Sequence, residues 1–114
     1  MSRLYSMTVY VEDFQAAHTA DIQKAANDEW SGLELRSNPV EGNVLSGEAE
    51  SQLCGGETEE EFALRISKAI FQANQGPCIV RVDAIYLEEL PYETYEHGPE
   101  DYDRVMNSVS VFDS

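Results

Sequence analysis

The stretch TEEEFALRISKAIFQANQGPCIVRVDAIYL, Thr58–Leu87, determines the predicted fold. Thr58 and Glu61 have the spacing of a capping box, in which each side chain accepts a hydrogen bond from the other residue's backbone N–H. Apolar residues then recur at helical spacing, at Phe62, Ile66, Ala69, Ile70 and Ala73. Gly76 is expected to supply the left-handed residue that ends the helix, and Pro77 prevents its continuation. The stretch therefore predicts a helix that begins at Thr58, followed by a strand.

Three segments alternate between apolar and polar residues, which is the pattern of strands with one buried face. They are residues 78–87, residues 4–11 (LYSMTVYV) and residues 44–53 (VLSGEAESQL). In the segment 4–11 the buried side chains are expected to be Tyr5, Met7, Val9 and Val11. A shorter strand is predicted in SGLELRS, residues 31–37, before the turn NPVEGN.

A first helix is predicted from Gln15 to Trp30, where Asp13 is placed to cap it and apolar residues fall on one stripe. The predicted order is β-α-β-β-α-β, with two helices on one face of an antiparallel sheet. This is an α+β, ferredoxin-like sandwich over residues 1–90. Residues 91–114 form a predicted acidic, Tyr-rich C-terminal extension outside that unit. Within it a short helix over 99–107 and a last strand in SVSVF are expected.

Charge is the strongest feature of the composition. The 114 residues carry 22 Asp and Glu against 7 Lys and Arg, a formal net charge of −15. Such a surface repels nucleic acid and anionic lipid and attracts basic surfaces. No apolar run reaches the roughly 20 residues that span a bilayer, and the N-terminus lacks a signal-peptide pattern. We therefore expect a cytoplasmic protein of one domain, with no direct contact to nucleic acid or membrane.

The segment SQLCGGETEEEFA, Ser51–Ala63, combines a cysteine, two glycines and several glutamates. A nucleophilic Cys54 would need a lowered pKa, but the neighbouring glutamates favour the thiol over the thiolate. The pair Gly55–Gly56 lacks the lysine of a phosphate-binding loop, and it is read as a sharp turn. No spacing typical of a metal site occurs either. The segment predicts a turn and a helix start, with no catalytic residue, cofactor or metal.

Cys54 and Cys78 are predicted to be free thiols. They fall at opposite ends of two parallel strands of the predicted sheet, about 20–25 Å apart at roughly 3.3 Å per residue. A disulfide requires Cα atoms within about 7 Å, so the two cannot be joined.

The uncovered face of the sheet is predicted to be mostly polar and acidic. Its side chains are expected to be Ser6, Thr8, Tyr10, Glu34, Arg36, Glu48, Glu50, Arg81 and Asp83. One central aromatic residue among carboxylates does not form the stacking platform of ferredoxin-like RNA-binding proteins. RNA binding is therefore disfavoured.

The extension combines tyrosines with a dense block of acids. These tyrosines either pack over the sheet or form a contact surface, since tyrosine is enriched at binding hot spots. On the second alternative, the predicted partner-binding residues are Glu48, Glu50, Tyr92, Tyr95, Glu96, Glu100, Asp101, Tyr102 and Asp103.

The chain from its first strand to about Tyr95, and above all SQLCGGETEEEFA and KAIFQANQGPCIVRVDAIYLEELPYETY, resembles a set of small acidic proteins of bacteria, phages and mobile elements. The resemblance implies no particular activity. Charge and the lack of a catalytic constellation favour a non-enzymatic interaction module that mimics nucleic acid. It would block a basic groove, as an inhibitor of a host nuclease or a CRISPR complex does. The alternative is a small structural or regulatory domain that self-assembles through its sheet, for example as a homodimer.

Overall fold

The computed structural model describes residues 3–37, 44–53, 57–86 and 92–107, and it has α+β architecture. Its elements are β1 (Arg3–Glu12), the 3₁₀ turn η1 (Ala16–His18), α1 (Thr19–Glu29), β2 (Arg36–Ser37), β3 (Val44–Leu53), α2 (Glu59–Asn74), β4 (Ile79–Tyr86), β5 (Tyr92–His97), the 3₁₀ turn η2 (Pro99–Asp101) and α3 (Tyr102–Met106). The strands form one five-stranded sheet in the order β2-β3-β1-β4-β5. Every neighbouring pair is antiparallel.

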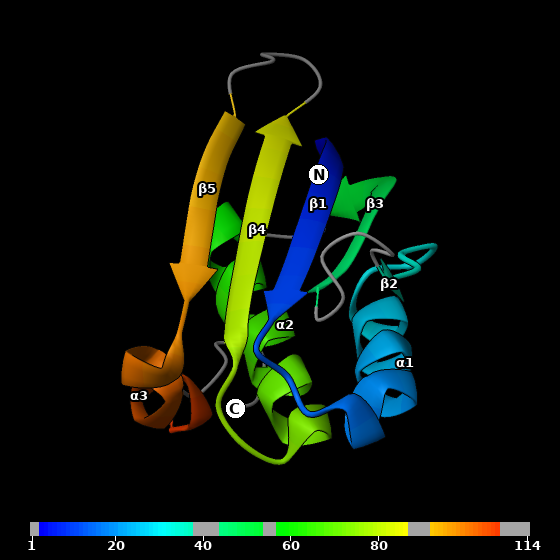
Figure 1. The fold of residues 1–114 in the computed structure, drawn as a ribbon. Helices are drawn as coiled ribbons and strands as arrows, with labels where there is room; N and C mark the ends of the chain where they lie inside the picture. Colours follow the sequence, from blue (N-terminus) through cyan, green and yellow to red (C-terminus); the bar gives the residue numbers. More distant parts are fainter. Residues whose placement is uncertain (1–2, 38–43, 54–56, 87–91, 108–114) are drawn as a thin grey trace.

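Both long helices lie on the same face of the sheet (Figure 1). The alternation in β1 sends its apolar side chains toward them, as predicted, and all four are at most 2 % exposed: Tyr5, Met7, Val9 and Val11. The helix α2 contributes a matching apolar stripe, with Phe62, Ala63, Ile66, Ile70 and Phe71 fully buried. The core is therefore a single layer between the sheet and the helix pair.

The first part of the extension is a strand of the sheet, which the sequence prediction had placed outside the β-α-β-β-α-β unit. β5 pairs with β4 from Val80↔His97 to Ile85↔Tyr92. The 3₁₀ turn η2 and helix α3 follow, within the predicted helical range of residues 99–107. Val105 of α3 is fully buried. The segment SVSVF lies outside the described residues.

The predicted capping box of α2 is confirmed. Thr58 Oγ1 accepts from Glu61 N at 3.1 Å, and Glu61 Oε1 accepts from Thr58 N at 2.9 Å. Gly76 was predicted to be the left-handed residue at the other end of α2. That prediction is wrong, because the left-handed residue there is Gln75, with φ 58°. The Asn74 side chain holds this turn by donating to the carbonyl groups of Gly76 and Pro77.

The start of α1 also differs from the prediction. Asp13 is itself left-handed, with φ 57°, so it does not cap the helix. The chain passes through η1 and enters α1 at Thr19 without a side-chain cap. Instead, the backbone N–H of Gln15 donates to Asn74 Oδ1 at 2.7 Å, which joins this connection to the end of α2.

Candidate functional site

The face of the sheet opposite α1 and α2, here called the open face, carries an ordered row of carboxylates and hydroxyls. Pairing of the strands aligns Glu48 of β3, Thr8 of β1, Asp83 of β4 and Thr94 of β5. Thr8 Oγ1 donates to Glu48 Oε2 at 3.0 Å, and Thr94 Oγ1 donates to Asp83 Oδ1 at 2.8 Å. These hydroxyls orient both carboxylates across the sheet.

A second row lies beside the first and contains the stack of Arg81 on Tyr10. The register aligns Arg36, Ser46, Tyr10, Arg81 and Glu96 across all five strands. The guanidinium carbon of Arg81 lies 4.1 Å from the centre of the Tyr10 ring, which is cation–π geometry. Arg81 Nε is 3.8 Å from Asp83 Oδ1 and makes no hydrogen bond. Arg81 is therefore held over β1, away from its cross-strand neighbour Glu96.

Three glutamates of the open face are solvent-exposed: Glu48, Glu50 and Glu96. Among the described residues, none of the three forms an ion pair with a basic side chain. Glu48 and Glu50 are two residues apart on β3, which separates them by about 7 Å along the strand. The sequence prediction had named all three as contact residues, and the strand register brings them onto one surface.

The other predicted contact residues lie elsewhere. Tyr95 faces the helices, and its hydroxyl is 3.4 Å from Glu59 Oε1. Tyr102 packs on Phe71, with ring centres 5.4 Å apart. Both tyrosines thus make contacts within the fold. The side chain of Tyr92 lies outside the described part of the structure.

The remaining predicted acids lie on η2 and α3. Asp101 accepts from the backbone N–H of Gly98 at 3.2 Å and pairs with Arg104 at 3.1 Å. The hydrogen bond from Gly98 lowers the pKa of Asp101, and the interaction with Arg104 lowers it further by a smaller amount. Glu100 and Asp103 are solvent-exposed.

Two polar clusters in the helical layer were not found from the sequence. Arg65 of α2 donates to both carboxylate oxygens of Glu57 and to the carboxylate and carbonyl of Glu29. His97 of β5 is 6 % exposed, and its Nδ1 lies 2.9 Å from Ser67 Oγ of α2. Ser67 is fully buried, so this pair cannot present a nucleophile to a substrate. Neither cluster has a local sequence signature, because each joins residues that are distant along the chain.

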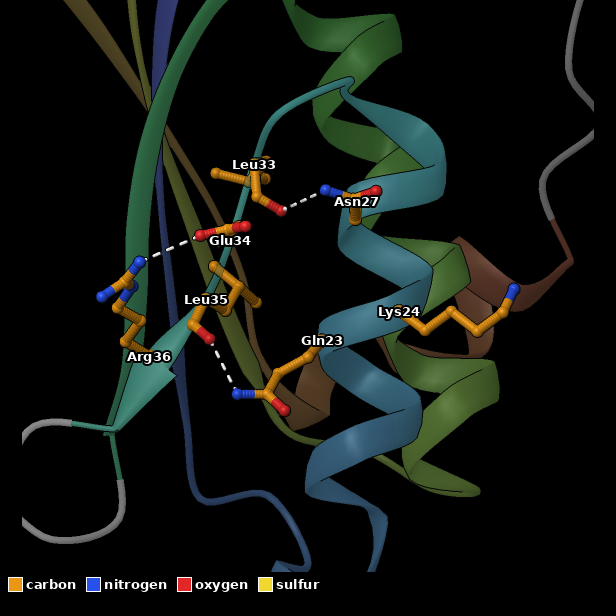
Figure 2. A pocket seen from close by; sticks show the side chains of 7 residues that line it. All are labelled: Gln23, Lys24, Asn27, Leu33, Glu34, Leu35 and Arg36. Carbon is orange, nitrogen blue, oxygen red and sulfur yellow. Dashed lines mark hydrogen bonds and ion pairs between the residues drawn. The ribbon is translucent and has the colours of Figure 1, made fainter.

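An open groove of about 620 Å³ lies between α1 and the segment that leads into β2 (Figure 2). Its lining residues are Gln23, Lys24, Asn27, Leu33, Glu34, Leu35 and Arg36. The side-chain amides of Gln23 and Asn27 cross the groove and donate to the carbonyl groups of Leu35 and Leu33. Arg36 pairs with Glu34 at 3.0 Å, so the charged groups of one wall neutralise each other.

Cys78 is a free, buried thiol, as predicted. Burial, with a smaller contribution from the charge of Asp13, raises its pKa to about 12, so it is not a nucleophile at neutral pH. Cys54 lies outside the described residues. Within the described ranges, no group of three or more His, Cys, Asp or Glu residues has the arrangement of a metal site. No helix in those ranges is long and apolar enough to cross a membrane.

Comparisons with known proteins give no match to a family model, to a curated protein or to a solved structure.

Proposed function

We propose that this chain is a non-enzymatic interaction module whose open face binds a basic surface of a partner protein. The observation that carries the proposal is the set of exposed glutamates on β3 and β5 beside the ordered Tyr10–Arg81 stack. Tyrosine and arginine are the residue types that most often anchor protein interfaces. Surrounding carboxylates would accelerate the encounter with a basic partner and select against acidic ones.

The negative field of the molecule comes from the excess of acids over bases, because each ion pair cancels one acid with one base. The sequence has 7 Lys and Arg. In the described part of the structure five of them pair with acids: Lys24, Arg36, Arg65, Arg81 and Arg104. These five paired groups are poorly placed to attract a nucleic-acid phosphate. The field instead resembles that of nucleic acid, and we infer that the partner's surface is a nucleic-acid-binding groove. A phage or mobile-element inhibitor that blocks a host nuclease or CRISPR complex would have to bind such a groove.

We also infer that β1 to β4 with α1 and α2 form a ferredoxin-like unit to which β5 adds a strand. The element order β1, α1, β2, β3, α2, β4 and the sheet order β2-β3-β1-β4 support this assignment. None of the described helices covers the open face of the sheet, and that face carries the proposed contact surface.

The test begins with capture of partners from host lysate on the immobilised chain at low salt. The association constant of each captured protein is then measured against salt for the native chain and for the triple variant Glu48→Gln, Glu50→Gln, Glu96→Gln. Affinity of the variant should fall at low salt, and its salt dependence should flatten. A duplex DNA or RNA should compete for the partner's groove.

The matched control is Asp13→Asn, Asp21→Asn, Glu60→Gln, which removes the same charge from exposed acids outside the open face. Asparagine tolerates the left-handed conformation of residue 13. Equal affinity and salt slope for the native chain and the open-face variant would refute the proposal. An equal loss in both variants would show that net charge, and not the open face, controls binding.

A further inference from the structure

The two edges of the sheet differ in how their backbone groups are satisfied. On the β2 side, three side chains donate to carbonyl groups of β3 and of the segment that leads into β2. Trp30 Nε1 donates to Ala49 O at 2.9 Å, Asn27 Nδ2 to Leu33 O at 3.1 Å and Gln23 Nε2 to Leu35 O at 2.8 Å. Figure 2 shows the two amide contacts beside the two-residue strand β2. These three acceptors already have donors, so they are not available to an added strand.

The opposite edge is formed by β5, which has six residues and pairs with β4 along its inner side. None of the described residues hydrogen-bonds to the backbone of β5 from its outer side. Figure 1 likewise shows no other labelled strand or helix alongside that outer side, and α3 lies beyond its end. Within the described residues β5 is therefore an edge strand, and an edge of this length is a template for another extended segment.

Charge determines which segment would fit. Glu96 lies on the open face opposite Arg81, and Glu93 lies on the other face opposite Ala84, so β5 presents an exposed carboxylate on each side. Arg81 stacks on Tyr10 and does not pair with Glu96. A second copy of β5 would bring glutamates against glutamates, which is destabilising, whereas lysine or arginine would form favourable cross-strand pairs.

We propose that the outer edge of β5 binds an extended basic segment of the partner protein as a sixth strand of the sheet. This rests on the proposed function, because it assigns to the basic partner a defined point of attachment next to the open face. Backbone hydrogen bonds would hold the segment, and Glu93 and Glu96 would select lysine or arginine on its two faces.

The test uses a synthetic peptide of about ten residues, the length of an ordinary strand. Valine and threonine alternate along it, with lysines on both faces. Its control has the same sequence and charge but carries N-methyl groups at two adjacent central residues, so that each edge of the peptide loses a donor. The plain peptide should bind at least tenfold more tightly than the methylated one. Amide protons of β5 should exchange more slowly when the plain peptide is bound.

Substitutions distinguish the contribution of the β5 edge to peptide binding from that of the open face. Glu93→Gln with Glu96→Gln should weaken binding of the plain peptide severalfold. Glu48→Gln with Glu50→Gln should leave the ratio between the two peptides unchanged. Equal affinity of the two peptides, unchanged exchange in β5, or no binding of the plain peptide at millimolar concentration would overturn strand addition. Those results would not affect the proposed function, which depends on the salt dependence of the captured partner.

Discussion

Arg65 and Glu57 form a two-point ion pair that joins the residue before the N-cap of α2 to the second turn of that helix. Arg65 Nε and Nη2 lie 3.0 Å and 2.9 Å from the two carboxylate oxygens of Glu57, whose side chain is 8 % exposed. Arg65 Nη1 also reaches the carboxylate of Glu29 at 2.8 Å, at the end of α1. The guanidinium of Arg65 therefore connects α2 to α1, the two helices that pack on the sheet.

Replacing Arg65 with methionine should lower the free energy of unfolding by about 1.5–3 kcal/mol, the usual value of hydrogen bonds to charged groups. The methionine keeps the apolar stem but removes both hydrogen bonds that the guanidinium donates to the buried Glu57 carboxylate. Chemical denaturation measures the loss. Lys24→Met removes an exposed pair with Asp28 and should leave the denaturation midpoint nearly unchanged. Adding Glu57→Gln to Arg65→Met should restore part of the stability, and no restoration would contradict the explanation.

The sequence predicted those elements whose local pattern agrees with their final environment. β1, β3 and β4 alternate in hydrophobicity, and Thr58 with Glu61 marks the start of α2, so all four were placed correctly. β5 was missed because YETYEH, Tyr92–His97, has no apolar alternation. Its strand conformation depends on pairing with β4, which is a long-range effect.

The candidate site was predicted only in part for the same reason: long-range contacts leave no local pattern in the sequence. The open-face position of Glu48 follows from period two within β3. The inward orientation of Tyr95 depends on the register between β5 and β4, which no local pattern gives. The clusters around Arg65 and His97 depend on contacts between separate elements.

Gly47 permits a close approach of two backbone segments, which leads to a second prediction. A Cβ at this position would lie 2.3 Å from the carbonyl oxygen of Glu34. Gly47→Ala should therefore destabilise the fold by about 1–3 kcal/mol, as overpacking does. At Gly76 the nearest atom to an added Cβ is Gln15 Nε2 at 3.8 Å, so Gly76→Ala is the control with little effect. Equal denaturation midpoints for the two variants would contradict the close approach.

Gln75 offers a stabilising substitution. It has φ 58°, a left-handed conformation that costs a residue with a side chain about 1–2 kcal/mol. Gln75→Gly should raise the free energy of unfolding by about 1 kcal/mol, since glycine adopts this conformation freely. Gln72→Gly, placed inside α2 on its exposed side, should instead lower stability by about 1 kcal/mol. Changes of the same sign in both variants would show that residue 75 does not end the helix.

Thr58→Ala tests whether helix stability and partner binding are separate. The variant loses the hydrogen bond from Glu61 N and should be less stable by about 0.5–2 kcal/mol. Thr58 lies at the start of α2, on the helical side of the sheet, so the affinity of the folded variant for a basic partner should not change. A weaker affinity under conditions where circular dichroism shows the native fold would place part of the contact surface at this helix end.

His97 makes the stability of the fold depend on pH. Its ring is buried between β5 and α2, and burial, followed by the positive charge of Arg104, lowers its pKa below the ordinary value of 6.5. The carboxylates of Asp101 and Glu60 act in the opposite direction without reversing the shift. The unfolded chain therefore takes up this proton more readily than the folded chain. The contribution of His97 to stability is complete above about pH 6.5 and is lost as the pH falls through the lowered pKa.

The free energy of unfolding of the native chain should therefore decrease below about pH 6.5, before the carboxylates begin to titrate near pH 4. In His97→Asn that decrease should disappear, whatever the absolute stability of the variant, because asparagine does not titrate. Denaturation in urea at a series of pH values gives both curves. Nuclear magnetic resonance of the His97 ring gives the folded pKa directly. Parallel curves for the two proteins, or a ring that titrates at or above 6.5, would contradict the buried neutral imidazole.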